Sequence, residues 1–167
     1  MSTIGPLVEE YKRETTVTRK LLERLPDDKW NFKPHPKSYS LGELVSHIVD
    51  IQTWATVTVE LDEFVMDPDT YKAFVGADRD SVLAGFDNGV TEATKALNVC
   101  TDEALTRDWT LKAPDGTVYV QNKKASILRD FVLSHMIHHR GQLTVYLRLN
   151  DVPLPQVYGP TADDPSM

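Results

Sequence analysis

Four stretches of the chain repeat apolar residues at steps of three and four, the spacing of one face of an α-helix. They run from about Pro6 to Leu25, Ser40 to Val65, Asp80 to Cys100 and Lys124 to Asn150. No linker or low-complexity tract divides the 167 residues. Four amphipathic helices in one uninterrupted chain predict an all-α fold, a four-helix bundle that forms a single domain over residues 1–167.

The second of these helices has the clearest start and the least clear end. Ser40 stands three residues before Glu43, the pattern of a capping box. The β-branched residues 56–59 are poor helix formers, but the apolar face continues through Phe64. We therefore expect this helix to continue to Val65.

The segment between the third and fourth helices has the pattern of a strand pair. Trp109–Lys112 and Thr117–Val120 are rich in β-prone residues and surround a turn that contains Asp115 and Gly116. This pattern predicts a small β-hairpin. The connections between the helices are long for a simple up-down bundle, so we expect crossover connections. The polar, proline-rich end from Tyr158 to Met167 is expected to be extended.

Charge and cysteine content narrow the classes of function. The net charge of −7 and the absence of a Lys/Arg cluster argue against binding to nucleic acid or to an anionic membrane surface. Cys100 is the only cysteine, which excludes an intramolecular disulfide and suits a reducing compartment. No apolar run approaches the roughly 20 residues of a membrane span, and the N-terminus lacks signal-peptide features. We expect a cytoplasmic protein.

Three histidines form the most informative pattern in the chain. His135 and His139 are four residues apart on the apolar stripe of the fourth helix, so their imidazoles project from one face. His47 lies on the apolar face of the second helix. A lone inward histidine is usually a core residue, but two at this spacing need partners, and one metal ion satisfies both. The sequence therefore predicts a mononuclear metal site with three His ligands.

Such a site has the composition of a catalytic centre. Three neutral imidazoles leave at least one coordination position for water or substrate. They suit zinc or nickel best, and iron, manganese or copper as alternatives. The residues expected to assist are Asp50, His138 and Gln142 beside the ligands, and Trp54 and Tyr146 in a substrate pocket. Plainer alternatives remain open: a solvated helix surface for Asp50 and His138, and an ordinary core for the two aromatic residues.

Other residues near these motifs receive no catalytic role. No Glu stands beside the histidines of the fourth helix, so a protease-style HExxH base is absent. His35 is flanked by prolines in a loop and is expected to be exposed. We expect Arg140 and Arg148 at the surface or in a subunit contact, and Gly141 to permit a close helix approach. The catalytic residues stay unknown.

Two segments of the chain resemble a known family. Trp30–Pro34 followed by Ser40–Ile48 resembles the loop and second helix of the DinB/YfiT-like family, and His135–Gln142 resembles its fourth-helix motif. The ending from Val145 to Asp163 is also similar. The resemblance implies a bundle with non-sequential helix order, often a homodimer. It also implies a divalent metal held by one His of the second helix and two of the fourth, which by position are His47, His135 and His139.

The resemblance also implies a reaction class. Some relatives resemble S-transferases that use low-molecular-weight thiols such as bacillithiol or mycothiol. We therefore expect a metal-dependent enzyme that transfers a thiol to an electrophilic small molecule in stress response or detoxification. Two alternatives stay open: a metal-dependent hydrolase of a small substrate, and a non-catalytic metal-binding stress-response module.

Overall fold

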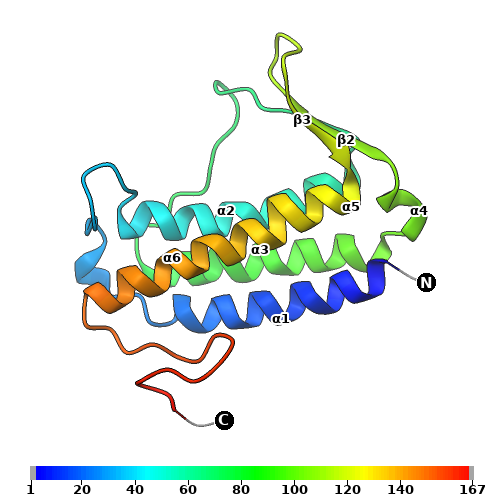
Figure 1. Cartoon of the computed structure of the whole chain (residues 1–167). Helices are drawn as coiled ribbons and strands as arrows, with labels where there is room; N and C mark the ends of the chain where they lie inside the picture. Colours follow the sequence, from blue (N-terminus) through cyan, green and yellow to red (C-terminus); the bar gives the residue numbers. More distant parts are fainter. Residues whose placement is uncertain (1–2, 166–167) are drawn as a thin grey trace.

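Four long helices lie side by side in the computed structural model, which describes residues 3–165 (Figure 1). They are α1 (Ile4–Leu22), α2 (Leu41–Glu60), α3 (Arg79–Val99) and α6 (His135–Leu149). α5 (Lys124–Ile127) and the π-helical segment η2 (Leu128–Ser134) precede α6 without a break. The fourth helical stretch thus covers residues 124–149, and the predicted four-helix bundle is confirmed.

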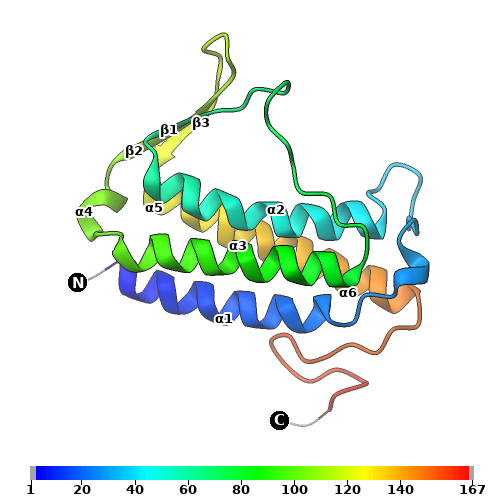
Figure 2. The ribbon, with the colours of Figure 1, turned by 180° about the vertical axis from the view of Figure 1, so that it is seen from behind.

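The helices are not arranged in chain order. α1 packs against α3 and α6, and α2 packs against the same two helices, so α1 and α2 are diagonal neighbours. α2 and α3 run in the same direction, and residues 61–78 carry the chain back outside α2 to begin α3 (Figures 1 and 2). The predicted crossover connection is this segment.

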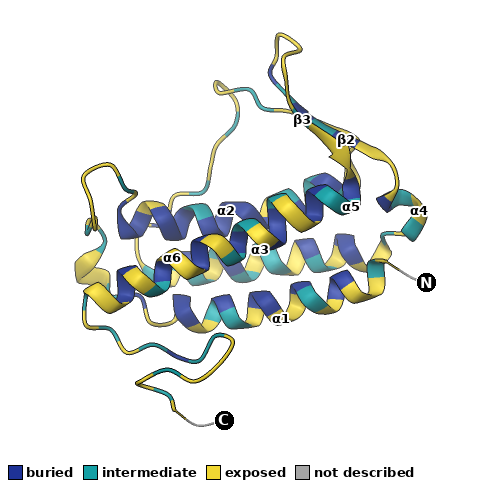
Figure 3. Cartoon of the chain, viewed as in Figure 1, coloured by how far each residue is buried: buried dark blue, intermediate teal, exposed yellow. Residues whose placement is uncertain are grey.

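The buried faces of the four helices meet in one apolar core (Figure 3). Side chains such as Leu21, Ile48, Phe86 and Leu143 are at most 1% exposed. Burial of one such side chain contributes on the order of 1.5–3 kcal/mol. One polar contact crosses the core, because the Tyr11 hydroxyl of α1 donates to Gln52 Oε1 of α2 over 2.8 Å.

The end of the second helix differs from the prediction. α2 ends at Glu60, and Glu63–Val65 form strand β1, so the expected helix to Val65 is wrong. β1 pairs in parallel with β2 (Asp108–Lys112), which pairs antiparallel with β3 (Val118–Lys123). The predicted hairpin is confirmed as β2 and β3, but the sheet has a third strand. Hydrogen bonding to β2, a segment far along the chain, decides the conformation of β1.

Two short elements have no counterpart in the sequence prediction. They are the 3₁₀ turn η1 (Asp27–Lys29) and helix α4 (Asp102–Leu105). The Asp102 carboxylate accepts hydrogen bonds from the backbone N–H groups of Thr3 and Ile4, both 2.8 Å. The start of α4 therefore satisfies backbone donors that the first turn of α1 leaves without helical partners.

The segment after α6 contains no helix or strand in its described part, up to residue 165, as expected for the end of the chain. Arg140 lies beneath this segment and is 1% exposed, so the expected surface position is wrong. Its guanidinium pairs with Glu14 of α1 (Nη2 to Oε2, 2.7 Å), and Tyr158 contacts both groups. A Cβ added at Gly141 would have no neighbouring atom within 4 Å, so the expected close helix approach at Gly141 is wrong.

None of the helices within residues 3–165 has both the length and the apolar character required to cross a bilayer.

Candidate metal centre

His47 of α2 and His135 and His139 of α6 converge between the two helices. One ring nitrogen from each lies within 4.8 Å of the other two, and the Nε2 atoms of His47 and His135 are 3.2 Å apart. His47 and His135 are half-buried, and His139 is 8% exposed. The structure thus brings together the three histidines that the helical spacing selected. We refer to these three residues as the His cluster.

The local sequence sets this geometry. The separation of four residues places His135 and His139 one turn apart on α6. The preceding segment η2 has the wider π-helical turn, with hydrogen bonds from residue i to i+5. Such π-helical turns in otherwise α-helical segments occur frequently at functional sites.

The environment keeps the imidazoles uncharged. The pKa of each of the three is lowered, with burial the largest cause in every case. Repulsion by a neighbouring imidazole of the cluster also lowers each pKa, that of His47 through His139, that of His135 through His47, and that of His139 through His135. The neutral imidazole is the form that binds a metal ion, so the cluster is a set of competent ligands at neutral pH.

Gln142 orients one of the rings. His139 Nδ1 lies 2.8 Å from Gln142 Oε1. An amide oxygen only accepts, so Nδ1 carries the proton and Nε2 keeps its lone pair for a ligand bond. A hydrogen bond to the Phe131 backbone acts on His135. Such contacts fix the tautomer of a metal-binding imidazole before the ion arrives.

One of the distances between the ring nitrogens fits a divalent ion. A tetrahedral ion that binds two imidazole nitrogens at roughly 2.0–2.1 Å holds them about 3.3 Å apart. The observed separation of 3.2 Å between His47 Nε2 and His135 Nε2 agrees with this value. Among residues 3–165, no carboxylate or thiol joins the group. The donor set is therefore three imidazoles, which leaves a coordination position for another molecule.

Asp50 and His138 have different surroundings. Asp50 is 8% exposed, its Oδ2 accepts from the Tyr71 hydroxyl over 2.7 Å and its Oδ1 from the Phe74 N–H over 3.3 Å. It is therefore no solvated surface carboxylate, and it ties residues 71–74 to α2. Its charge works to raise the pKa of His47, against the larger effect of burial. His138 is exposed, with its ring centroid 4.8 Å from that of His139.

Trp54 is half-buried and Tyr146 is buried, and both pack against core residues. The Trp54 ring lies 5.5 Å from Phe64 and 6.3 Å from Trp109, beneath the small sheet. Tyr146 is 8% exposed and its hydroxyl donates to the Tyr39 carbonyl over 2.9 Å. Tyr146 thus supports Tyr39, whose ring centroid is 6.1 Å from that of His47.

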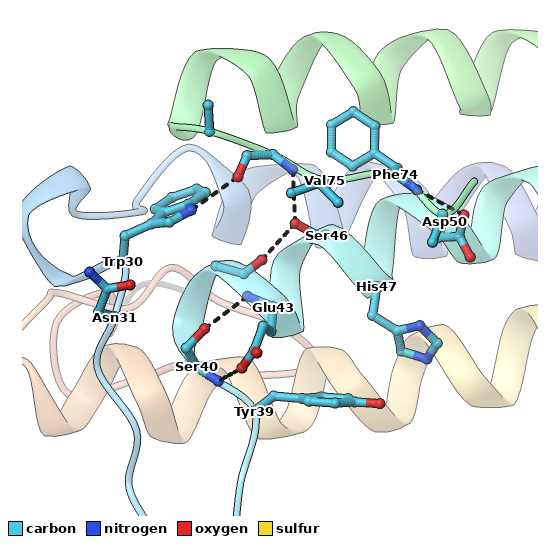
Figure 4. Close-up of a pocket in the computed structure, with 14 residues that line it drawn as sticks. Trp30, Asn31, Tyr39, Ser40, Glu43, Ser46, His47, Asp50, Phe74 and Val75 are labelled. Atoms are coloured by element: carbon cyan, nitrogen blue, oxygen red, sulfur yellow. Dashed lines mark hydrogen bonds between the residues drawn. The ribbon is translucent and has the colours of Figure 1, made fainter.

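Two cavities reach the His cluster. One, of about 490 Å³, lies over α2 and includes His47, Asp50 and Tyr39 in its lining (Figure 4). The other, of about 380 Å³, is lined by Asp130, Phe131, Ser134, His135 and His138. Sequence reasoning missed Tyr39 and the loop residues of the first cavity. The only local signal was that Tyr39 precedes the capping residue Ser40.

The sequence and the fold both match known proteins. A sequence model described as the DinB family matches residues 1–166. Protein YjoA of Bacillus subtilis is 31% identical over 150 residues, which cover 89% of this chain and 91% of YjoA. A crystal structure of a DinB-like protein from Bacillus cereus ATCC 10987 has a TM-score of 0.71 at 25% identity, and covers 91% of this chain and 95% of its own. A structure of a member of the same family from Exiguobacterium sibiricum shares the fold, with a TM-score of 0.66 at 18% identity over 92% of this chain and 95% of its own.

Proposed function

The chain belongs to the DinB family, and we propose that it is a divalent-metal-dependent enzyme that transfers a low-molecular-weight thiol to an electrophilic small molecule. One observation carries the proposal: three neutral imidazoles converge, and two separate cavities reach this cluster, one at His47 and one at His135. His47, His135 and His139 would hold the ion. The family resemblance supports the thiol as one substrate and a role in stress response or detoxification.

The chain's own residues prepare the cluster for this chemistry. Burial keeps the three rings neutral, and Gln142 holds the His139 proton on Nδ1. When bound, a divalent cation supplies a Lewis acid and lowers the pKa of a thiol in contact with it, so that the nucleophilic thiolate forms at neutral pH. The all-imidazole set favours zinc or nickel, and would also accept iron, manganese or copper.

The two cavities favour transfer over hydrolysis. A transfer needs two organic molecules to meet at one centre, and the cavities at His47 and at His135 give each its own position. The thiolate sulfur donates an electron pair to the electrophilic carbon, a C–S bond forms, and the leaving group departs with its bonding pair. The thiol proton passes to solvent. Hydrolysis needs a base beside the cluster, and among residues 3–165 no carboxylate joins the three imidazoles.

Metal content tests the ligand assignment. Untagged protein, purified without chelator, is expected to carry about one divalent ion per chain by elemental mass spectrometry. The His135→Ala variant is expected to lose it, and His35→Ala, which alters an exposed loop histidine, is expected to keep it. Unchanged stoichiometry in His135→Ala would refute the assignment.

Turnover tests the reaction class. The metal-loaded protein is expected to convert an electrophile such as 1-chloro-2,4-dinitrobenzene only when a small thiol is added, with loss of activity in His135→Ala. Turnover without thiol would favour the hydrolase. Tight metal binding with no turnover on a panel of electrophiles and thiols would favour the non-catalytic module. The family resemblance also supports a homodimer, which light scattering on the eluting protein tests.

A further inference from the structure

The cavity at His47 extends along α2, away from the His cluster. Its lining on this helix begins at Gly42, where Trp30 packs against α2, and continues through Ser46 to His47. Gly42 and His47 are five residues apart, which corresponds to about 7.5 Å along the helix axis. Figure 4 shows Trp30 at one end of this row of residues and His47 at the other. A ligand that reacts at the His cluster can therefore reach as far as Trp30.

The Trp30 end of the cavity is held in place by hydrogen bonds. Trp30 Nε1 donates to the Gly76 carbonyl over 3.0 Å, and the Gly76 N–H donates to Ser46 Oγ over 2.9 Å. Gly42 lets the Trp30 ring approach α2, because a Cβ at residue 42 would overlap that ring. These contacts join α2 to the loop that follows η1 and to the loop before α3. The cavity is therefore formed before a ligand arrives, which lowers the entropic cost of binding.

Polar groups between the two ends are bonded within the protein. Ser46 Oγ donates to the Gly42 carbonyl over 2.7 Å and accepts from the Gly76 N–H. The Glu43 carboxylate accepts from the Ser40 N–H over 2.6 Å. A ligand gains little from polar groups at these positions, because it would have to replace bonds that the protein already makes. Recognition along the cavity therefore depends on apolar contact.

Apolar side chains flank the cavity and remain exposed. Tyr39 is 52% exposed and Val75 is 82% exposed, and Figure 4 shows them on opposite sides of α2 beside His47. The backbone on either side of Val75 is fixed, because Phe74 and Gly76 both donate hydrogen bonds to side chains of α2. An apolar chain that lies between Tyr39 and Val75 removes both from water, and the gain in free energy rises with the apolar area covered.

We propose that the cavity at His47 takes the electrophile, and that this substrate has a linear apolar tail that lies along α2 and ends at Trp30. Six C–C bonds of about 1.5 Å, which advance a zigzag chain by roughly 1.3 Å each, span the distance between His47 and Trp30. A tail of about six carbons beyond the reacting carbon therefore fits. The assignment of the substrate rests on the proposed function, because the reaction takes place at the His cluster. The tail site itself does not depend on a metal ion.

Alcohols that differ only in chain length test the tail site without chemistry. 1-Butanol, 1-hexanol and 1-octanol are titrated into the ¹⁵N-labelled full chain after treatment with a chelator, and amide and indole signals are followed. We expect the affinity to rise about two- to fourfold per methylene group. The indole signal of Trp30 and the amide signal of Gly76 should move, whereas the indole of Trp109, buried under the sheet, should not. Equal affinities, or shifts confined to Gly141 and Thr144, which line a separate cavity, would overturn the proposal.

Aldehydes that share one reactive group test the substrate class. 2-Butenal, 2-hexenal and 2-nonenal carry one, three and six carbons beyond the reacting carbon, and 2-mercaptoethanol is the thiol. The thiolate sulfur bonds to the β-carbon, the electron pair of the C=C bond moves to the α-carbon, and the α-carbon takes a proton from solvent. We expect kcat/KM for 2-nonenal to exceed that for 2-butenal at least about tenfold, after subtraction of the uncatalysed addition. Equal values for the three aldehydes would contradict the proposal.

Substitutions at the Trp30 end test where the tail ends. Ala77 follows Gly76 and lines the cavity, so Ala77→Phe places a ring where the tail would end, and Asn31→Phe does the same from the other loop. In each variant we expect the ratio of kcat/KM for 2-nonenal to that for 2-butenal to fall about three- to tenfold, chiefly through KM. Ala84→Phe adds the same ring at an exposed position of α3 outside the cavity and should keep the wild-type ratio. An unchanged ratio in both Ala77→Phe and Asn31→Phe would refute the tail site.

The outcome is separable from that of the proposed function. A chain that turns over the three aldehydes equally and shows no preference for the longer alcohol loses this proposal and keeps the proposed function. A chain that turns over none of the aldehydes but selects the longer alcohol at Trp30 keeps the tail site and loses the proposed function.

Discussion

At the scale of single residues, the orientation of the His139 ring depends on one neighbour. Gln142 Oε1 accepts from His139 Nδ1, and the Gln142 side chain is at the surface of α6. We predict that Gln142→Ala weakens divalent metal binding about 10- to 100-fold with little change in stability. Competition with a chromogenic chelator measures the affinity. Val145→Ala, an exposed position on the same helix, is the control. Wild-type affinity in Gln142→Ala would show that the ring needs no such partner.

The three imidazoles also make stability depend on pH. Their pKa values are lowered in the fold, chiefly by burial, so the unfolded chain binds protons more readily around its own pKa of about 6.5. The contribution of the neutral imidazoles to the stability of the fold is complete above about pH 6.5. It is lost as the pH falls from there through the lower pKa values that the imidazoles have in the folded state. We predict that metal-free protein has a lower Tm at pH 5.5 than at pH 7.5. Replacement of His47 and His135 by glutamine should reduce this difference, and an equal Tm at both pH values would contradict the prediction.

The His cluster was predictable from the sequence because its geometry is local. Helical spacing places His135 beside His139, and the apolar stripe of α2 turns His47 to the same interior. Arg140 was misplaced for the opposite reason: it bonds to Glu14, 126 residues away. No periodic pattern indicates a buried guanidinium, because its burial depends on a carboxylate from another helix.

At the scale of elements, the helices followed from periodicity, whereas the strand β1 did not. Its three residues pair with Thr110, Leu111 and Lys112, and the apolar Phe64 fits the face of a helix as well as that of a strand. The long-range pairing therefore overrides the local pattern. The position of the loop before α3 could not be predicted from the sequence either, because it depends on long-range contacts such as the hydrogen bond from Gly76 to Ser46.

Two helical glycines are predicted to respond in opposite ways to a methyl group. At Gly42 an added Cβ would overlap the Trp30 ring, and we expect Gly42→Ala to lower the free energy of unfolding by about 1–3 kcal/mol. At Gly141 the same change meets open space, and we expect Gly141→Ala to raise it by up to about 1 kcal/mol, as alanine favours helix. Urea unfolding of both variants checks the pair. A stabilised Gly42→Ala would mean that Trp30 does not hold its place against α2.

At the scale of the whole molecule, one buried ion pair joins α1, α6 and the C-terminal segment. Burial by itself would raise the pKa of Glu14, but hydrogen bonds from Tyr158 and Arg140 hold that pKa below its usual range. Glu14 and Arg140 have side chains only 3% and 1% exposed. Arg13, an exposed neighbour on α1, also contacts Glu14, but removal of either Glu14 or Arg140 leaves the other charge without its buried partner.

We predict that Arg140→Ala lowers the free energy of unfolding by about 3–5 kcal/mol, and that Tyr158→Phe lowers it by about 1–2 kcal/mol through loss of the hydroxyl bond to Glu14. Arg148→Ala, which breaks an exposed pair with Asp163, is the control and should cost less than about 1 kcal/mol. Urea unfolding gives the three values. A similar loss in Arg140→Ala and Arg148→Ala would contradict a special role for the buried pair.

The order in which this ion pair is completed has a consequence for synthesis. The ribosome makes Glu14 well before Arg140 and Tyr158. Until residue 140 has emerged, the Glu14 carboxylate on the inner face of α1 lacks its buried partner and has the exposed Arg13 beside it, and until residue 158 has emerged the Tyr158 hydroxyl is missing as well. In a nascent or prematurely terminated chain that lacks residue 140, closure of the bundle around α1 would bury the Glu14 carboxylate without its buried cation. Completion of the fold therefore waits until residues 140 and 158 have both been translated.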